Sequence, residues 1–310
     1  MDVKFSIISE NQWTTLKKSS PYASPFQDYG WGMLTTKILG GSFSPVLAQI
    51  EGLKWLVPLY KNNPWASKPN EYSIGGIGYG GPLPTHRLVD VGKELEYVIK
   101  IIAQLRLFIN SDHIKAILYP SSVWENSESS KINLSKTCRI ELANNTDTVF
   151  NKTLSGNART AIRKSNKSAV IIREINILTL DEVKEAHLLL TKTQKKVHAQ
   201  YLTDYDLFLS LSTTKLQTAV SKTFVAIYKG RIIGVASLIY DGNEAFHLFH
   251  GWDEEYKQLC SNQALIWHML CFSVDRGIRL FNMGESHTDS LLKAKLRWGA
   301  KIEYVPKIYQ

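Results

Sequence analysis

The sequence predicts an α/β protein of two tandem domains, each a mixed, twisted sheet flanked by helices. The 310 residues suffice for two domains of ordinary size, and 44% hydrophobic against 21% charged residues is a globular balance. The chain also repeats one plan, because each half places an X-Gly dipeptide between two apolar, β-rich runs. We therefore expect a first domain over residues 1–135 and a second over residues 136–310. The polar stretch 121–135 is the expected linker.

In the first half, turn and capping signals predict the elements. The segment Ser9–Gln12 fits a capping box, which marks the start of a helix. Val46–Tyr60 reads VLAQIEGLKWLVPLY, and its Glu51-Gly52 pair predicts a hairpin because glycine readily adopts the positive φ of a tight turn. A helix over about Val91–Ile109 and the strand IKAILYP complete this half.

The second half repeats this order. A helix is expected to begin after Thr179, with acidic residues in its first turn and lysines in its last. Phe224–Tyr240 reads FVAIYKGRIIGVASLIY, a hairpin with Lys229-Gly230 at its turn. The strand EAFHLFHGW, a helix over about Asn262–Arg276 and the strand IRLFNMG follow. This mixed order predicts sheets with strands of both senses.

Positive charge is concentrated in the second half of the chain. The formal net charge is +9, and residues 151–310 contribute 22 basic and 15 acidic residues. Two acid-poor runs lie there, Thr148–Arg173 and Leu291–Gln310. This pattern favours a phosphate-bearing substrate site in the second domain, although a solvated basic face would leave the same pattern.

Cysteine usage and hydropathy predict a cytoplasmic protein. The three cysteines, Cys138, Cys260 and Cys271, form no C-x-x-C pair, which favours free thiols in a reducing compartment. No stretch approaches the roughly 20 apolar residues of a membrane helix, and the N-terminus lacks the apolar run of a signal peptide. His247 and His250 form an H-x-x-H pattern on an expected strand. Residues i and i+3 of a regular strand point to opposite faces, so we expect no metal site.

A glycine-rich segment imitates a dinucleotide-binding loop. Ile74–Leu83 reads IGGIGYGGPL and contains a formal G-x-G-x-x-G. Such a loop must open directly into a helix so that backbone N–H groups reach the phosphates. Here Pro82 and Pro84 follow, and the next expected helix begins only near Val91. We therefore predict a turn in which backbone segments approach closely.

Several motifs resemble those of the FemABX-type enzymes within the GNAT acyltransferase superfamily. Leu154–Val170 is similar to the pattern R-x-x-I-R-K-x-x-K-x-G-V, and Ala294–Gly299 (AKLRWG) is similar to F-K-x-x-F-G. Tyr79–Leu83 resembles an R-G-P-V stretch, and Phe281–Gly284 a y-D-x-G strand end. Together with the duplicated plan, these motifs extend the resemblance over most of the chain. The resemblance implies two tandem GNAT-like domains with the acyl-transfer site in the second.

The resemblance also implies a reaction and its partners. FemABX-type enzymes transfer an amino acid from aminoacyl-tRNA to an amino group of a peptidoglycan precursor. Related proteins with a BioF2-like acyltransferase domain use other acyl donors. We therefore expect a nucleotide- or phosphate-bearing acceptor, with tRNA and a membrane surface as further candidate partners, and no bound cofactor. The donor is either aminoacyl-tRNA or acyl-CoA. The glycines of a CoA pyrophosphate loop are missing from the equivalent segment, Tyr256–Ala264.

Three residues are candidates for the chemistry. Acyl transfer to an amine requires a deprotonated amine, a stabilised oxyanion and a compensated leaving group. By resemblance, Lys295 would stabilise negative charge at the oxyanion or at the departing ribose oxygen; an exposed lysine on a basic tail is the alternative. Glu285 and His287 follow the strand IRLFNMG, where ligands of α/β sheets often bind, and either is a candidate general base.

Six further residues are candidates for substrate binding. If Leu154–Val170 is helical, Arg159 and Arg163 lie one turn apart on one face and together could grip a pyrophosphate. The others are Lys164 from the same segment, Tyr256, Asn262 and Trp298.

The sequence leaves three functions open. The first is a FemABX-like transferase that modifies a peptidoglycan or polysaccharide precursor. The second is an acyl-CoA-dependent N-acyltransferase that acts on an amino sugar or another small amine. The third is a non-catalytic nucleic-acid-binding protein, which we rank last because the basic runs are not interleaved with aromatic residues.

Overall fold

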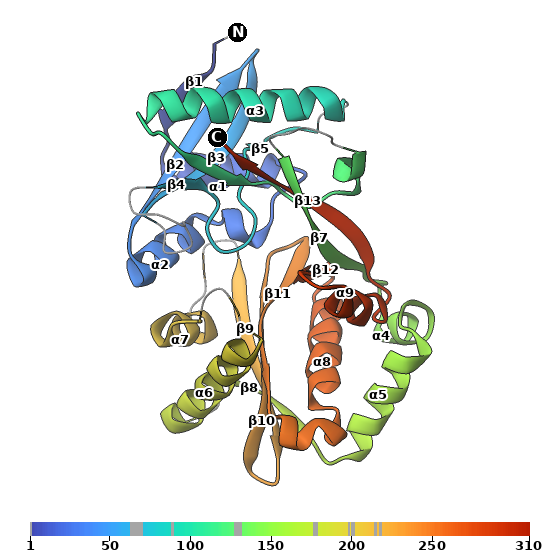
Figure 1. Cartoon of the computed structure of the whole chain (residues 1–310). Helices are drawn as coiled ribbons and strands as arrows, with labels where there is room; N and C mark the ends of the chain where they lie inside the picture. Colours follow the sequence, from blue (N-terminus) through green and yellow to red (C-terminus); the bar gives the residue numbers. More distant parts are fainter. Residues whose placement is uncertain are drawn as a thin grey trace. The chain divides into compact units, whose positions relative to one another are not determined.

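The computed structural model describes residues 2–62, 71–87, 90–126, 132–175, 179–197, 199, 202–213, 216 and 219–310. Its helices and strands (Figure 1) are, in chain order, β1 (Lys4–Ile7), α1 (Glu10–Ser19), α2 (Tyr29–Leu39), β2 (Ser42–Ile50), β3 (Leu53–Lys61), β4 (Tyr72–Ile74), β5 (Leu83–Pro84), α3 (Val91–Phe108), β6 (Ile114–Ile117), β7 (Ile132–Glu141), α4 (Thr146–Thr148), α5 (Gly156–Lys167), β8 (Ile171–Glu174), α6 (Leu180–Lys196), α7 (Tyr205–Thr213), β9 (Val220–Tyr228), β10 (Arg231–Tyr240), β11 (Glu244–Trp252), α8 (Ser261–Asp275), β12 (Leu280–Glu285), α9 (Asp289–Leu296) and β13 (Lys301–Tyr309). Short helical turns occupy η1 (Pro25–Gln27), η2 (Ser122–Asn126), η3 (Val149–Thr153) and η5 (Glu254–Leu259).

The chain divides into two compact units. Unit 1 consists mainly of Met1–Thr137 and Glu303–Gln310, and unit 2 mainly of Cys138–Lys215 and Ala219–Ile302. The sequence places residues 303–310 in the second domain, whereas the structure places them in the first. The reason is pairing: β13 runs antiparallel to β6, with Lys307 opposite Ile117.

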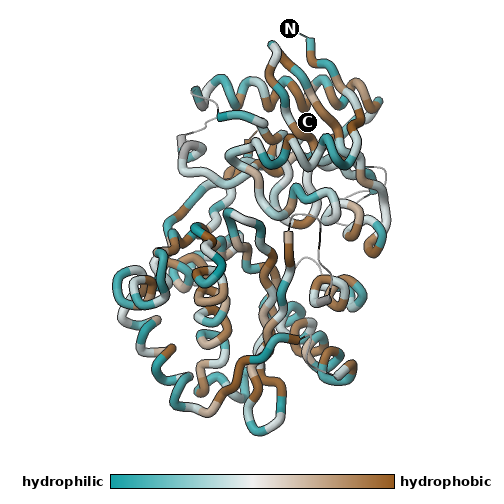
Figure 2. The backbone as a smooth tube through the Cα atoms, turned by 180° about the vertical axis from the view of Figure 1, so that it is seen from behind, coloured by the Kyte–Doolittle hydropathy of each residue, from teal (hydrophilic) through white to brown (hydrophobic). Residues whose placement is uncertain are grey.

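Each unit contains a mixed sheet, as the sequence predicts. In unit 1 the strand order is β1-β2-β3-β4-β6-β13, with β4 and β6 parallel and the other neighbours of known register antiparallel. In unit 2 the order is β7-β12-β11-β10-β9-β8, with β11 and β12 parallel. Figure 2 shows that hydrophobic residues concentrate on the strands of each unit. Each unit has its own core, which includes Trp13 and Trp55 in unit 1 and Phe281 in unit 2.

Both predicted hairpins form, with the same turn. Glu51 and Gly52 have φ of 51° and 80°, and Lys229 and Gly230 have φ of 49° and 80°. Two successive positive φ angles are those of a type I′ turn, whose twist matches that of the flanking strands. The X-Gly dipeptide therefore determines the hairpin in both halves.

Side-chain caps also define the helices, and the one at Ser9 is predicted by the sequence. Ser9 and Gln12 form a complete capping box at the start of α1, and Thr179 and Glu182 form another at the start of α6. Asp90 caps α3 by accepting from the backbone N–H groups of Gly92 and Lys93. These side chains satisfy backbone donors that the first helical turn leaves unpaired.

Helices α6 and α8 cover opposite faces of the β9–β11 sheet in unit 2 (Figure 1). Two glycines allow this close packing. A Cβ on Gly251 of β11 would lie 2.7 Å from Leu190 Cα in α6, and a Cβ on Gly234 of β10 would lie 2.9 Å from a methyl group of Leu265 in α8.

The glycine-rich segment forms a loop, as predicted, and the next helix begins only at Val91. The backbone N–H groups of Gly80 and Gly81 both donate to Ile117 O, and the Gln27 amide donates to Tyr79 O and Gly80 O. A Cβ on Gly80 would lie only 2.4 Å from the Gly75 backbone. The glycines therefore serve close backbone packing.

The expected linker is partly regular structure. Residues 122–126 form η2, and 132–135 begin strand β7; residues 127–131 lie outside the described part of the chain. Among the described residues, no helix is both long and apolar enough to cross a membrane.

Candidate active site

A cavity of about 620 Å³ lies within unit 2. Its lining residues come from α5, β11, α8, β12, α9 and positions 297–298. The cavity occurs where two parallel strands stop pairing. The β11–β12 register ends at Phe246 and Asn282, whereas β11 continues to Trp252 and β12 to Glu285. The strand segments beyond the ladder line the cavity, so backbone and side chains there are available to a ligand.

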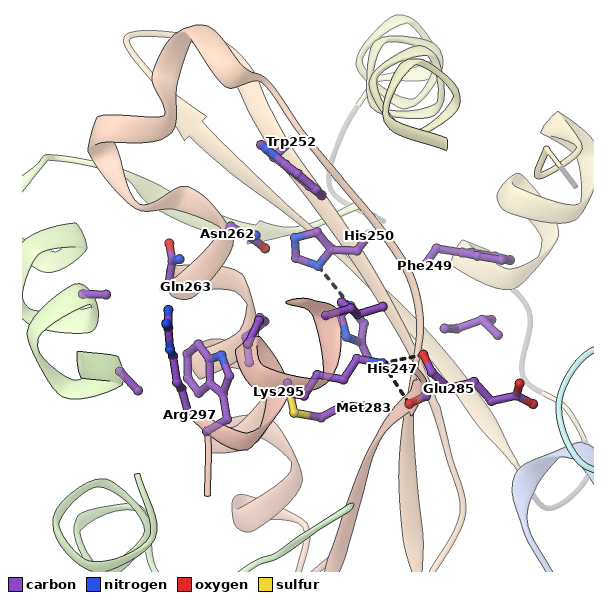
Figure 3. A pocket seen from close by; sticks show the side chains of 18 of the residues that line it. His247, Phe249, His250, Trp252, Asn262, Gln263, Met283, Glu285, Lys295 and Arg297 are labelled. Carbon is purple, nitrogen blue, oxygen red and sulfur yellow. Dashed lines mark hydrogen bonds between the residues drawn. The ribbon is translucent and has the colours of Figure 1, made fainter. Parts of the chain in front are cut away.

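Lys295 lies in the last turn of α9 and points into the cavity (Figure 3). Its side-chain ammonium donates to Gly284 O at 2.8 Å and to Glu285 O at 2.7 Å. Only 8% of the residue is exposed, and this burial lowers the pKa of Lys295 to about 8. The exposed lysine that the sequence left as an alternative is therefore wrong: the lysine is buried and held by β12.

His247 and His250 also lie in the cavity, in direct contact. His247 Nε2 and His250 Nδ1 are 3.0 Å apart (Figure 3). This arrangement corrects the expectation that the two side chains point to opposite faces. A β-bulge is the cause: Ser237 pairs with Phe249 but Leu238 pairs with His247, which leaves one extra residue in β11.

The register shows the effect of this bulge directly. His247 is opposite Leu238, and His250 is opposite Ala236. Ala236 and Leu238 are two residues apart on β10 and therefore point to the same face, so their partners do too. Among the described residues, however, no group of three or more His, Cys, Asp or Glu side chains could hold a metal ion.

Burial makes both imidazoles weak bases. Desolvation lowers the pKa of His250 to about 4, against a smaller opposing effect of the Asn262 side chain. Desolvation also holds the pKa of His247 well below its usual value, with His250 and the positive charge of Lys295 as smaller causes. Both rings are therefore neutral at pH 7. Six buried side-chain polar atoms of the described residues make no hydrogen bond of normal geometry, and two of them, His250 Nε2 and Asn262 Oδ1, belong to cavity residues. Asn262 lies beside His250 in Figure 3.

The structure brings four predicted site residues to the cavity. Lys295, Glu285, Asn262 and Trp298 line it. Glu285 contributes mainly its backbone, because its carbonyl binds Lys295 while its carboxylate points away from the histidines (Figure 3). The His287 side chain is 73% exposed and does not line the cavity.

The other predicted binding residues lie elsewhere in unit 2. Arg159 and Arg163 are on α5, as expected, but neither lines the cavity. Arg159 donates to Leu154 O at 2.7 Å and to Asn151 O at 3.2 Å, and Arg163 lies over the Phe150 ring at 5.2 Å. The two guanidiniums are not placed to bind one pyrophosphate together, because both interact with the turn before α5.

Lys164 and Tyr256 are also outside the cavity. Lys164 is exposed on α5, and Tyr256 packs near Tyr228 and beneath the Arg231 guanidinium. Tyr256 belongs to η5, which leads into α8 through Cys260, a residue with φ of 55°. The side chains that enter the cavity from this region are instead Asn262 and Gln263, in the first turn of α8.

Sequence reasoning missed His247, His250, Trp252 and Arg297 as cavity residues. The H-x-x-H pattern is visible in the sequence, but the period of a regular strand predicts that the two side chains lie on opposite faces. No residue pattern in EAFHLFHGW reveals the bulge, since a bulge is a property of pairing between strands. Arg297 was within reach of sequence reasoning, because it precedes Trp298 in the motif AKLRWG.

Comparison with known proteins identifies the fold of both units. Residues 157–289 match the acetyltransferase (GNAT) domain model. No curated protein matches the chain by sequence. The crystal structure of FemX has a TM-score of 0.67 at 12% identity, over 97% of this chain and 96% of that chain.

Two other solved structures have the same fold over nearly the whole chain. A tandem GNAT protein from the clavulanic acid biosynthesis pathway gives a TM-score of 0.54 at 10% identity, over 99% of this chain and 98% of that one. L-PGS from Bacillus licheniformis gives 0.54 at 11% identity, over 98% and 93%. The cavity with Lys295 lies in the unit that carries the match to the acetyltransferase (GNAT) domain, and the chain has the tandem fold shared by these proteins.

Proposed function

We propose that this acyltransferase transfers an aminoacyl group from aminoacyl-tRNA to an amino group of a peptidoglycan or polysaccharide precursor. The observation that carries acyl transfer is the buried ammonium of Lys295 in the cavity of unit 2. A cation held in a site of low dielectric stabilises a developing oxyanion far more than one in water. The cavity of about 620 Å³ is of the size that holds a small ligand group.

The geometry of Lys295 suits this role. Two carbonyl oxygens, of Gly284 and Glu285, fix the position of its ammonium. A lysine ammonium has three N–H donors. These two contacts leave the third donor for the oxyanion of the tetrahedral intermediate or for the departing oxygen, since the described residues provide no third hydrogen bond to this ammonium.

The N-terminus of α8 suits an acyl donor that is an ester, such as aminoacyl-tRNA, better than a donor that binds through a pyrophosphate. Pyrophosphate binding at a helix N-terminus requires close approach to backbone N–H groups, which glycine permits. Here Cys260 occupies the position before the helix, and Asn262 and Gln263 present side chains to the cavity. The FemABX resemblance adds aminoacyl-tRNA as the corresponding donor.

Arg297 is the proposed contact for a phosphate-bearing acceptor. It is exposed, carries a guanidinium suited to phosphate, and lines the cavity next to Trp298. A cytoplasmic location, with access to tRNA and to precursors at the membrane surface, belongs to the same proposal.

An acyl-CoA donor is the second candidate. The match of residues 157–289 to an acetyltransferase domain favours it. In this case the acceptor would be an amino sugar or another small amine, and Lys295 would compensate the charge of a departing thiolate.

A donor assay with two lysine variants tests the proposal. Purified protein is given either charged tRNA or acyl-CoA, together with a nucleotide-linked muramyl peptide or an amino sugar. We expect transfer from charged tRNA, and a loss of about 10²–10³ in kcat for Lys295→Met. Lys293→Met is the matched control, because Lys293 is on the same helix but exposed.

The two donors give distinct outcomes. Transfer from acyl-CoA alone would replace the tRNA proposal with the second candidate. Equal losses in both variants, or transfer unaffected by Lys295→Met, would contradict the role of the buried ammonium.

A further inference from the structure

The two histidines of the cavity are buried and contact each other at 3.0 Å. His250 Nε2 makes no hydrogen bond of normal geometry among the described residues, although the Asn262 side chain lies close enough to interact with His250. Leaving a buried polar nitrogen unpaired costs about 1–3 kcal/mol. An unpaired ring nitrogen in a cavity beside Lys295 is therefore a site prepared for a ligand atom.

We propose that His250 is the catalytic base that takes the proton from the attacking amine, and that His247 is the positioning residue that orients it. This inference rests on the acyl transfer to an amine proposed above. It assigns the base to β11, whereas the sequence placed it at Glu285 or His287.

The contact between the rings defines the tautomer that a base needs. A neutral imidazole has one N–H and one lone pair. If His250 Nδ1–H donates to His247 Nε2, the lone pair of His250 is on Nε2, the atom that makes no hydrogen bond of normal geometry among the described residues and has Asn262 as its polar neighbour. His247 thus accepts the hydrogen bond that a carboxylate or a carbonyl group accepts from other catalytic histidines.

The proton and electrons balance in a simple cycle. The amine nitrogen attacks the acyl carbon, a C–N bond forms, and the carbonyl oxygen becomes an oxyanion near Lys295. The amine N–H proton moves to His250 Nε2, which gives an imidazolium. When the intermediate collapses, the bond to the leaving alcohol or thiol breaks with its electron pair, and His250 returns the proton to that group.

The surroundings of His250 favour this proton transfer. The charged side chains that line the cavity are Lys295 from α9, Arg297 after α9 and Glu285 from β12; α8 presents the neutral Asn262 and Gln263. This environment keeps His250 neutral and able to accept a proton. The oxyanion that forms beside Lys295 adds negative charge, which stabilises the imidazolium at the moment it appears.

Neither sequence-predicted base has comparable geometry. The Glu285 carboxylate points away from the histidines (Figure 3), and the His287 ring is 73% exposed. Its nitrogen is 4.0 Å from the Glu285 carboxylate, at the upper limit of an ion pair.

Kinetics of three histidine variants test the base. We expect His250→Ala to lower kcat about 10²–10⁴-fold with KM changed only a few-fold. Added imidazole should restore part of this loss, since the truncation leaves room for it, and should not restore Lys295→Met. His287→Gln is the matched control and should keep the activity of the unaltered protein. Full activity in His250→Ala, or a loss confined to His287→Gln, overturns the proposal.

Nitrogen-15 NMR of histidine-labelled protein tests the dyad without any substrate. We expect His250 Nε2 to be unprotonated at pH 7 and His250 to titrate well below pH 6. His247→Phe should move the His250 proton to Nε2, and His247→Gln, whose amide oxygen can accept from Nδ1–H, should restore the original tautomer. A protonated Nε2 in the unaltered protein overturns the proposal.

The two experiments separate this inference from the proposed function. If no amine is acylated by the unaltered protein, the proposed function fails, and the NMR result still decides whether His250 has the state of a base. If the amine is acylated and His250→Ala is fully active, only the assignment of the base fails.

Discussion

At the scale of single residues, Lys295 shows how burial changes the meaning of a side chain. In the sequence it is one of five basic residues in the run Leu291–Gln310. In the structure it is buried, and the carbonyl groups of Gly284 and Glu285 hold its ammonium. Desolvation disfavours the charged form, which lowers the pKa of Lys295 to about 8.

This shift predicts the alkaline pH dependence of the reaction. Because the pKa is lowered to about 8, Lys295 loses its positive charge as the pH rises through that value. We expect kcat/KM, corrected for the ionisation of the acceptor amine, to fall above about pH 8. Lys295→Arg keeps its charge throughout this range, so its profile should lack the fall. An identical fall in both proteins would show that another group is responsible.

At the scale of elements, the two hairpins can be predicted from local sequence, whereas the bulge in β11 cannot. Each hairpin follows from two adjacent residues, because Glu51-Gly52 and Lys229-Gly230 adopt the φ angles that the turn needs. The bulge in β11 depends on how this strand pairs with β10. It cannot be recognised in one segment, yet it decides that His247 and His250 share a face.

The end of α9 offers a prediction about stability. Gly299 has a φ of 77°, and a Cβ there would lie 2.1 Å from Thr153 O. Backbone atoms cannot move aside easily, so Gly299→Ala adds a clash to the roughly 1–2 kcal/mol of a left-handed alanine. We expect a loss of more than about 3 kcal/mol in the free energy of unfolding, measured by urea denaturation.

Gly230→Ala measures the cost of a left-handed alanine without the steric clash expected at Gly299. Gly230 has a similar φ of 80°, but a Cβ there would have no neighbour within 4 Å. We expect Gly230→Ala to lower the free energy of unfolding by about 1–2 kcal/mol, which is the cost of the left-handed conformation alone. Equal losses at the two positions would mean that the contact with Thr153 is relaxed at little cost.

At the scale of the whole molecule, the last residues complete the first unit. Strand β13 pairs with β6, and Ile308 is fully buried in the core that contains Trp13 and Trp55. The core of unit 1 therefore includes residues that follow the whole of unit 2 in the sequence. The two halves of the sequence resemble each other, but they are not two separable pieces of chain.

Ile308→Ala tests this dependence. Removing a fully buried isoleucine side chain costs about 2–5 kcal/mol, although Ile308 is only two residues from the C-terminus. Thermal unfolding should show this loss. Ile7→Ala is the control, because Ile7 is 71% exposed, and its effect should be within about 0.5 kcal/mol. Similar effects for the two variants would show that β13 does not contribute to the core.

The sequence by itself determined the local structure and the type of fold. The capping box at Ser9, the helix start at Thr179, two X-Gly turns and the order of apolar runs depend on neighbouring residues, and each formed as expected. The motif AKLRWG likewise pointed to Lys295, because a lysine at the second position of a short motif can be read without a structure.

Tertiary structure decided which side chains meet. Arg159 and Arg163 have the helical spacing of a phosphate grip, but neighbouring carbonyl groups and Phe150 engage them. His247 and His250 have the wrong spacing for one face of a regular strand, but a bulge brings them together beside Lys295. Local conformation is set by short-range sterics and hydrogen bonds, whereas a site depends on strand register and burial, which only distant segments supply.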